Sequence, residues 1–189
     1  MDKLLIHKAG QHYLIFNVET FKELVVAHKI YPYSCLLGEH DGVPRLPVIL
    51  DKYQIRYLLK NRRDLVKIQE TFSENEQGLV VEKVNDLEIH DVSDRVFELK
   101  YLFFELLTPN YYVVDGLKFG CDFLLYKEIP YRSHSTHCVT VLGREKRISM
   151  DDLVSRMRCS RSGGKVAVLA SIEDGKINAF CLKWVNIIP

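Results

Sequence analysis

The feature that most constrains the fold is a polar, acidic stretch at residues 70–91, which separates two regions of regular apolar spacing. Positions 71–78 read Thr-Phe-Ser-Glu-Asn-Glu-Gln-Gly, a composition more typical of a connection than of a core element. A chain of 189 residues is long enough for two small domains. We therefore expect a mixed N-terminal domain at 1–70, a linker or extended arm at 71–92, and a C-terminal domain at 93–189.

The composition is that of an ordinary soluble globular protein, with 47% hydrophobic and 27% charged residues. No apolar run approaches the roughly 18 residues that span a bilayer. The first residues, Met-Asp-Lys-Leu-Leu-Ile-His, are charged almost at once, so we expect no signal peptide. Five scattered cysteines, an odd number, predict reduced and mostly buried thiols in an intracellular protein. A net charge of +1 argues against bulk affinity for nucleic acid.

The N-terminal region contains hairpin and helix signals. Residues 3–8 and 12–16 predict a hairpin, and Asn17 can cap a helix over 18–29. We further expect short strands at 34–37 and 48–50, a second helix capped by Asp51, a closing strand at 65–68 and an extended segment at 79–84.

The C-terminal region begins with a helix over 94–107, with Ser93 as its candidate cap, and Pro109 stops it. Its helix-period apolar stripe consists of Val96, Leu99, Phe103 and Leu106. After it we expect strands at 111–114, 118–126, 134–142, 165–172 and 176–187, a helix at 150–158 and a hairpin turn at 173–175. This order predicts an α/β (α+β) fold, with a central mixed or antiparallel sheet flanked by helices.

Three chemically active residues lie at the ends of consecutive predicted strands: Tyr126, His134 and Lys165. Singly, each is ordinary, because a tyrosine at a strand end usually packs, a histidine is usually structural and a lysine is usually solvated. Together, a phenol, an imidazole and an ammonium can cleave RNA through its own 2′-hydroxyl: one removes a proton, one supplies a proton and one balances charge. Tyrosine, with a pKa near 10, is a poor base unless neighbouring cations lower that value.

A local basic window extends from Arg144 to Lys165, where seven basic residues face three acidic ones, a net charge of +4. The basic window can be interpreted equally well as a phosphate-binding surface or as a solvent-exposed helix with its flanking loops. A zinc site of His134, His137 and Cys138 is not expected, because the two histidines would point to opposite faces of one strand. We expect no metal and no other cofactor.

The segment at 116–126, Gly-Leu-Lys-Phe-Gly-Cys-Asp-Phe-Leu-Leu-Tyr, resembles the signature G-x-K-F/Y-G-x-D-F-x-x-Y of the tRNA-splicing endonuclease family. His134-Ser135 resembles the family's histidine at the start of the following strand. Arg158, Ser162 and Lys165 resemble the family's R-x-x-x-S-x-x-K block. The order of elements over 93–189 is similar, whereas the likeness at 46–50 is weak. The most similar branch is the eukaryotic catalytic subunit that cuts the 3′ splice site.

The resemblance implies a general base at Tyr126, a general acid at His134 and an electrostatic stabiliser at Lys165. It also implies that Arg158 and Trp184 clamp an extruded base; the other interpretation of Trp184 is an apolar plug at a subunit interface. Arg161, in the basic window, is a further candidate RNA contact. The implied reaction cleaves precursor tRNA without a metal and leaves a 2′,3′-cyclic phosphate and a 5′-hydroxyl.

The resemblance also implies other subunits of a hetero-oligomeric complex, with no membrane, in the nucleus or alternatively the cytoplasm. The predicted last strand, apolar on both faces, needs a partner to cover it. Two departures from the family pattern are Lys-Glu-Ile-Pro at 127–130 and Gly-Gly at 163–164, where Val-Arg is common. A displaced lysine would make the chain a degenerate paralogue. A non-catalytic structural subunit and an archaeal-type homo-oligomer are the alternatives.

Overall fold

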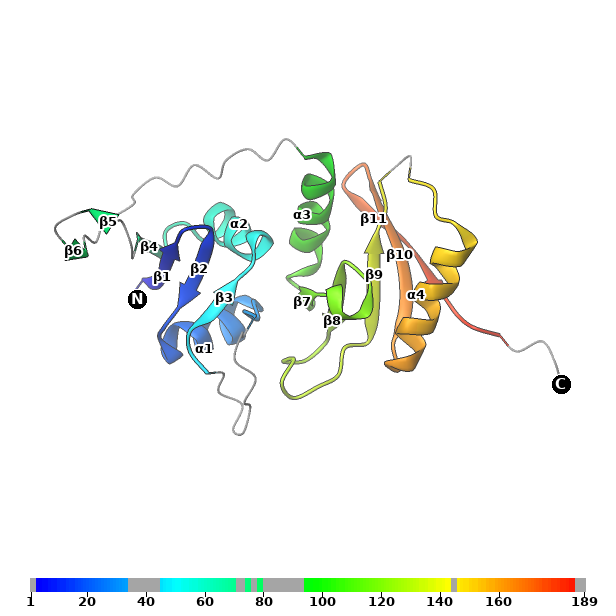
Figure 1. Cartoon of the computed structure of the whole chain (residues 1–189), viewed down its shortest axis with the longest axis horizontal. Coiled ribbons are helices and arrows are strands. Elements are labelled where there is room, and N and C mark those ends of the chain that lie inside the picture. Colours follow the sequence, from blue (N-terminus) through cyan, green and yellow to red (C-terminus); the bar gives the residue numbers. More distant parts are fainter. Residues whose placement is uncertain are drawn as a thin grey trace. The chain divides into compact units, whose positions relative to one another are not determined.

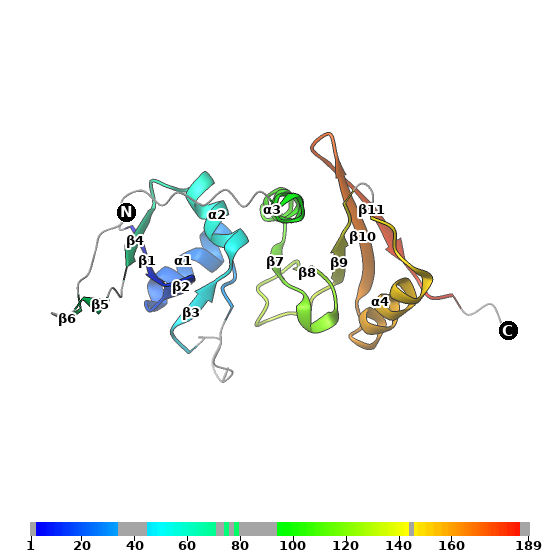
Figure 2. The same cartoon turned by 45° about the horizontal axis from the view of Figure 1, so that its top comes forward.

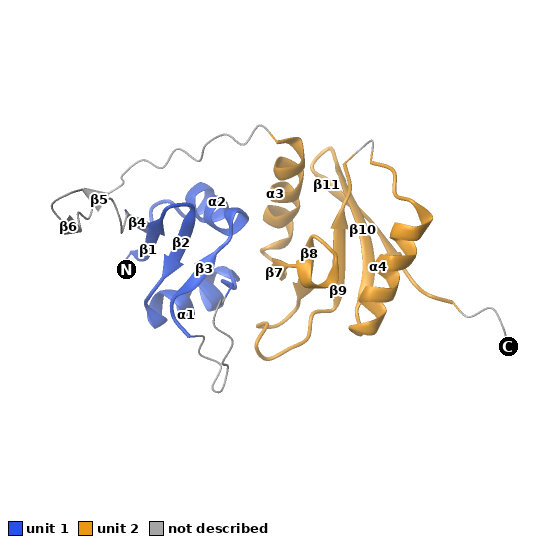
Figure 3. Ribbon diagram, in the orientation of Figure 1, with its two compact units in different colours: residues 1–92 blue, residues 93–189 orange. Residues whose placement is uncertain are grey.

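The computed structural model describes residues 3–33, 45–70, 74–75, 78–79, 94–143 and 146–185. The chain divides into two compact units, residues 1–92 and 93–189 (Figure 3). Within the described residues, the first unit contains a four-stranded sheet and the second a five-stranded one, each with two α-helices. The predicted α+β class is thus confirmed. None of the described helices is long and apolar enough to cross a membrane.

The N-terminal unit is built on the predicted hairpin of β1 (Leu4–Ala9) and β2 (His12–Ile15). The remaining elements are α1 (Val18–His28), β3 (Val48–Leu50), α2 (Lys52–Asn61), β4 (Val66–Glu70) and the short pair β5 (Glu74–Asn75) and β6 (Gly78–Leu79). The strand order is β3-β2-β1-β4, with β4 parallel to β1. The strand predicted at 34–37, and all of that at 79–84 except Leu79, lie outside the described residues.

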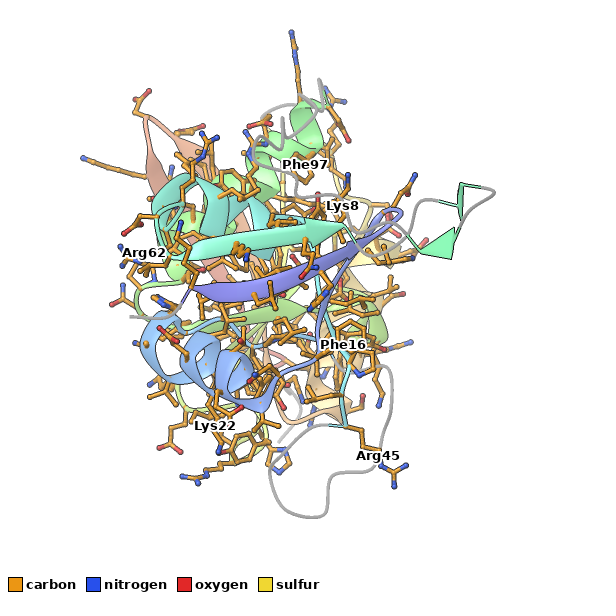
Figure 4. All side chains as sticks on the ribbon, turned by 90° about the vertical axis from the view of Figure 1, so that its left-hand side faces the viewer. Lys8, Phe16, Lys22, Arg45, Arg62 and Phe97 are labelled. Carbon is orange, nitrogen blue, oxygen red and sulfur yellow. The ribbon has the colours of Figure 1, made fainter. Side chains whose placement is uncertain are left out.

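Both helices of this unit begin at the predicted caps. The side chain of Asn17 accepts hydrogen bonds from the backbone of α1, and Asp51 forms a capping box with Gln54 at the start of α2. The core of the unit lies between helices and sheet, where Ile6, Ile15, Leu24, Val48 and Leu58 are fully buried. Directly after β2 comes Phe16, which is labelled in Figure 4. Its ring stands edge-on against that of His7, with ring centroids 5.0 Å apart.

The C-terminal unit contains α3 (Arg95–Leu107), β7 (Tyr112–Asp115), the 3₁₀ turn η1 (Leu117–Phe119), β8 (Phe123–Tyr126), β9 (His137–Val141), α4 (Met150–Ser162), β10 (Val166–Glu173) and β11 (Lys176–Leu182). The strand order is β11-β10-β9-β8-β7 (Figure 1). Only β9 and β10 pair in parallel among these strands, and α4 makes the crossover that a parallel pair requires. The predicted turn at 173–175 is confirmed, with Asp174 and Gly175 both at positive φ.

The two helices of this unit cover opposite faces of its sheet. Phe103, on α3, stacks on Phe123 with ring centroids 5.8 Å apart, and Phe123 pairs with Val139 on one face. From α4, Arg156 donates a 3.0 Å hydrogen bond to Oγ1 of Thr140, which points to the other face. Figure 2 shows α3 nearly end-on beside the sheet. The face under α4 is therefore distinct from the aromatic core under α3.

The predicted apolar stripe of α3 is confirmed at Phe103 and is wrong at both ends. Val96 and Leu106 are 56% and 40% exposed, whereas Phe97, Tyr101 and Phe104 are buried together with Phe103. Both sides of this helix are apolar, and the aromatic side buries more area against the sheet. The cap is Asp94, which accepts from the backbone of Val96; the predicted Ser93 lies outside the described residues.

Several predicted strand boundaries also need correction. The strand expected at 118–126 begins only at Phe123, because residues 117–119 form η1 and Gly120 closes that turn at φ 66°. The strand expected at 134–142 spans His137–Val141, and the last strand ends at Leu182 rather than at 187. The helix expected at 150–158 continues to Ser162.

The expectation of mostly buried thiols holds for only part of the chain. Cys138 is buried and Cys121 is half-buried, but Cys159 and Cys181 are exposed; Cys35 lies outside the described residues. All four described thiols are free. Burial, reinforced by the neighbouring Cys138, raises the pKa of Cys121 to about 12, so this thiol is poorly nucleophilic at neutral pH.

Candidate active site

Strand register brings Tyr126 and Lys165 to the same edge of the C-terminal sheet. The backbone N–H of Thr136 donates to Leu125 O at 2.9 Å, and that of Val166 donates to Thr136 O at 3.0 Å. Extending the pairing by one residue puts Tyr126, Thr136 and Lys165 in one row across the strands. These three residues form a candidate catalytic row, which we call the catalytic row for short. With strands about 4.8 Å apart, the Cα atoms of Tyr126 and Lys165 lie about 10 Å from each other.

The catalytic row points to the sheet face under α4. Leu124, Cys138 and Ala167 align across the sheet and share one face. Each member of the row is two residues away from one of them and therefore points to the same face. A phenol and an ammonium thus lie on the same side of the sheet, in one row across the strands.

The Tyr126 side chain is half-buried, and desolvation raises the pKa of its phenol above the ordinary value. The Ser135 side chain lowers this pKa, although Ser135 Oγ is buried and has no partner at regular hydrogen-bond geometry. The condition that would make Tyr126 a good base, a pKa lowered by neighbouring cations, is not met in this structure. The phenol is therefore protonated at neutral pH, and any role as a base depends on a small phenolate fraction or on transfer within the complex with RNA.

His134 lies in the loop before β9 and not in the strand, contrary to the sequence-based expectation. The imidazole is exposed, while its neighbour Ser135 is only 5% exposed and anchors the chain beside Tyr126. Ser133 shapes the other side of the loop by donating to Glu128 O or Ile129 O at 3.3 Å. The anchored neighbours place His134 near the edge that carries the catalytic row and leave its side chain open to a ligand.

Lys165 is held where α4 ends and β10 begins. Its backbone N–H donates to Ser160 O at 2.8 Å, and the preceding Gly164 takes φ 67°, a conformation that favours glycine. The Lys165 Nζ donates to Gly163 O at 2.8 Å and lies 4.2 Å from the centroid of the Phe119 ring. The two glycines therefore cap the helix and direct the lysine; they do not displace it.

A groove of about 310 Å³ opens beside Lys165. Its lining residues are Met157, Arg161, Lys165, Val166, Ala167, Leu182, Lys183 and Trp184. Trp184 is 47% exposed, so one large aromatic surface faces solvent among three cations. This combination suits a nucleobase, which can stack on an aromatic ring, and the phosphates attached to it.

The structure separates the basic residues that the sequence grouped together. Arg161 lines the groove, but Arg158 is an exposed residue of α4 and does not. Arg156 has a structural contact, since its guanidinium donates to Gly120 O at 2.7 Å and to Thr140. Arg144 lies outside the described residues. The described arginines of the basic window thus differ in their contacts: Arg161 lines the groove, Arg156 is bound within the fold and Arg158 is exposed.

The signature-like segment at 116–126 has a structural explanation. A side chain at Gly116 would collide with Cys121, whose backbone oxygen would be 2.9 Å from the added Cβ. Asp122 pairs with Lys100 Nζ at 2.6 Å and accepts from Val141 N at 2.8 Å, which joins α3, β8 and β9. These residues fix the start of β8 and, through it, the position of Tyr126.

Sequence reasoning missed three residues that shape the site: Phe119, Thr136 and Gly163. Phe119 belongs to the signature-like segment, which gave a signal for it, but its contact with Lys165 joins residues far apart in the chain. No group of three or more His, Cys, Asp or Glu side chains suited to a metal ion occurs among the described residues. The strand-face argument against zinc no longer applies, because His134 precedes β9.

Comparison with known proteins identifies the class to which this fold and site belong. The sequence model of the family described as "tRNA intron endonuclease, catalytic C-terminal domain" matches residues 97–179. A tRNA-splicing endonuclease of Thermococcus gammatolerans is 32% identical over 115 residues, covering 60% of this chain and 67% of that protein. One of Sulfolobus acidocaldarius is 26% identical over 182 residues, covering 94% and 96% respectively.

A eukaryotic relative matches over a shorter region. The mouse tRNA-splicing endonuclease subunit Sen34 (Mus musculus) is 33% identical over 92 residues, covering 47% of this chain and 29% of that protein. The chain belongs to the tRNA-splicing endonuclease family. The catalytic row and the groove lie in or beside the region that the family's catalytic domain matches.

Proposed function

We propose that this chain is a catalytic subunit that cleaves precursor tRNA at an intron boundary, at the 3′ splice site. The reaction is a metal-independent transesterification. The 2′-oxygen attacks phosphorus, the bond to the 5′-oxygen breaks, and the products are a 2′,3′-cyclic phosphate and a 5′-hydroxyl. The RNA loses one proton from the 2′-hydroxyl and gains one at the 5′-oxygen, and no other atom is added or removed in this step.

The observation that carries the proposal is the catalytic row. Tyr126, at the end of β8, and Lys165, directly before β10, lie on one face and at one edge, and His134 lies two residues before the middle member of the row. Tyr126 removes the 2′-proton, and His134 protonates the departing 5′-oxygen. Lys165 balances the charge that develops on the non-bridging oxygens. Because burial raises the pKa of Tyr126, the base is the limiting group.

Substrate contacts are proposed for the groove. Trp184 supplies a stacking surface for an extruded base, and Arg161 contacts the same base or its phosphate. Arg158 is assigned to the RNA backbone outside the groove. This division makes Trp184 and Arg161 specific for the flipped nucleotide, whereas Arg158 contributes sequence-independent affinity.

The proposed assembly is a hetero-oligomer with other subunits of a tRNA-splicing endonuclease, in the nucleus. The mouse relative is itself called a subunit, and exposed apolar side chains on and after β11 offer a contact surface: Phe180 is 70% exposed and Val185 is 72% exposed. The native mass of the chain with and without candidate partners separates this arrangement from an archaeal-type homo-oligomer. Fluorescent tagging of the full chain tests the nuclear location against the cytoplasm.

The catalytic roles are tested by substitution in the purified complex. His134→Ala or Lys165→Ala should lower single-turnover cleavage by about 10²–10⁴-fold, the range for a positioned acid or charge stabiliser, while RNA binding changes little. His12→Ala removes an exposed histidine from the N-terminal unit and serves as the matched control. Unaltered cleavage by His134→Ala would mean that the chain is a non-catalytic structural subunit.

The nucleophile is tested with altered substrate. A precursor tRNA with a single 2′-deoxy residue at the scissile position should bind normally and resist cleavage, because it lacks the attacking oxygen. Activity on normal substrate should survive excess EDTA. A chelator-sensitive reaction that leaves a 3′-hydroxyl would contradict the proposed chemistry.

A further inference from the structure

The ammonium of Lys165 is held by an aromatic ring and a carbonyl oxygen. Nζ lies 4.2 Å from the centroid of the Phe119 ring and 2.8 Å from Gly163 O. The ring comes from η1, before β8, and the carbonyl from the C-terminal end of α4, which contacts η1. We call the Phe119 ring and the Gly163 carbonyl the lysine seat.

Position 163 is a glycine because a side chain would have no room there, and not because the backbone conformation requires one. Gly163 has φ −87° and ψ 7°, which other residues can adopt. A Cβ at this position would lie 2.8 Å from Cε1 of Phe119 and 3.0 Å from Lys165 Nζ. Gly164 shows the opposite case, with φ 67° and no atom near an added Cβ. The two adjacent glycines therefore serve different purposes.

We propose that Phe119 is a positioning residue for Lys165, and that Gly163 is glycine because the seat leaves no room for a side chain. This inference rests on the proposed role of Lys165 as the charge stabiliser. An aromatic face attracts a cation without carrying a formal charge. It therefore fixes the ammonium and leaves its full positive charge for the phosphate, whereas a carboxylate partner would neutralise it.

The seat also leaves hydrogen-bonding capacity for the substrate. An ammonium has three N–H donors, and the bond to Gly163 O uses one. A lysine side chain without such contacts loses considerable rotamer freedom when it binds a ligand. Holding Lys165 in advance lowers that cost and keeps the ammonium at the groove that Arg161 and Trp184 line.

The geometry can be measured independently of cleavage. Reductive dimethylation of the lysines of the full chain with ¹³C-formaldehyde and a borane or borohydride reductant gives one dimethylamine NMR signal per lysine, and Lys165→Arg assigns the signal of interest. Groups above a ring face are shifted upfield by the ring current. The Lys165 signal should be upfield in the wild type and in Phe119→Tyr, and should move to the position of solvated lysines in Phe119→Leu.

Cleavage gives the second readout. In the purified complex, Phe119→Leu should lower the single-turnover rate about 3- to 30-fold, the range for loss of one cation–π contact, with RNA affinity unchanged. Phe119→Tyr, which keeps the ring, should retain a rate close to the wild type. Gly163→Ala should shift the Lys165 signal and lower the rate, whereas Gly164→Ala should lower stability and leave the signal upfield.

The two readouts separate failure of the seat from failure of the proposed function. A Lys165 signal that is the same in the wild type and in Phe119→Leu would overturn the seat, even if Lys165→Ala is inactive. If the Lys165 signal is upfield in the wild type but the Lys165→Ala variant keeps full activity, the seat stands and the catalytic role of Lys165 is rejected. Thermal unfolding of each variant identifies those that are merely unfolded. A full rate in a folded Phe119→Leu would also overturn the inference.

Discussion

The three proposed catalytic side chains differ in how firmly the protein holds them. Lys165 has a hydrogen bond and a ring contact, and Tyr126 is half-buried. His134 is exposed in a loop whose neighbours are anchored. In the proposed mechanism, the base and the cation are therefore held before RNA binds, whereas the acid takes its final orientation from the substrate.

The pH dependence of cleavage tests the assignment of Tyr126 at this scale. Burial raises the pKa of its phenol, so the active phenolate fraction grows tenfold for each pH unit below that value. When His134→Ala removes the acid, the logarithm of the single-turnover rate should rise with a slope of about one between pH 7 and 9. The double variant with Tyr126→Phe should lose this slope. A rising line that persists without the phenol would assign the base to another group.

At the scale of elements, the burial of α3 differs most from the sequence-based expectation. The aromatic side of the helix packs on the sheet through Phe103 and Phe104, which contact Phe123. The aliphatic side includes Val96, Leu102 and Leu106 and is substantially exposed. An apolar stripe at helical spacing identifies a helix, but it selects the buried face only when the opposite face is polar.

Stability measurements on α3 distinguish the two faces. Phe104→Ala should lower the free energy of unfolding by about 3–5 kcal/mol, because it removes a side chain that is 1% exposed from the core. Leu106→Ala, at 40% exposure, should cost about 1 kcal/mol or less. Urea denaturation of both variants gives the comparison. If Leu106→Ala lowered the free energy of unfolding more than Phe104→Ala, the buried face of α3 would be the one expected from the sequence.

Local chemistry explains which elements the sequence predicts well. The caps Asn17 and Asp51 and the turn at 173–175 depend on side chains next to the backbone they serve. The start of β8 was misplaced because residues 118–120 have strand-like composition, and the turn there depends on Gly120 at positive φ. The trio of the candidate site could be found from strand ends, but the contact of Phe119 with Lys165 links positions 46 residues apart in number and depends on packing.

At the scale of the whole molecule, β11 is the edge strand of the C-terminal sheet. An edge strand offers unpaired backbone groups, and exposed apolar side chains on it favour association with another chain. The predicted extension to residue 187 is not present in β11, and residues 186–189 lie outside the described part. Apart from Trp184, which is proposed as an RNA contact, the exposed apolar side chains here are Phe180 and Val185.

Association through this edge can be tested by placing a charge on it. Phe180→Asp should weaken binding of the partner subunit by at least about tenfold, since a buried unpaired carboxylate is costly. Asn178→Asp, on the same strand and face, adds the charge without removing the apolar group and should have the smaller effect. Native mass spectrometry at nanomolar concentration measures the complex. A monodisperse, fully active monomer would refute the proposed dependence on a partner.

The parallel pairing of β9 with β10 has a consequence for the order in which the protein forms. β10 can join the sheet only after the crossover through α4 has been made, and such non-local pairing is slow to form. Tyr126 and the loop with His134 belong to an antiparallel hairpin-like segment that is synthesised and can pair earlier. Lys165 is therefore the last of the three to arrive. A chain in which β10 has not yet docked therefore lacks the placement of Lys165 on which the proposed cleavage depends.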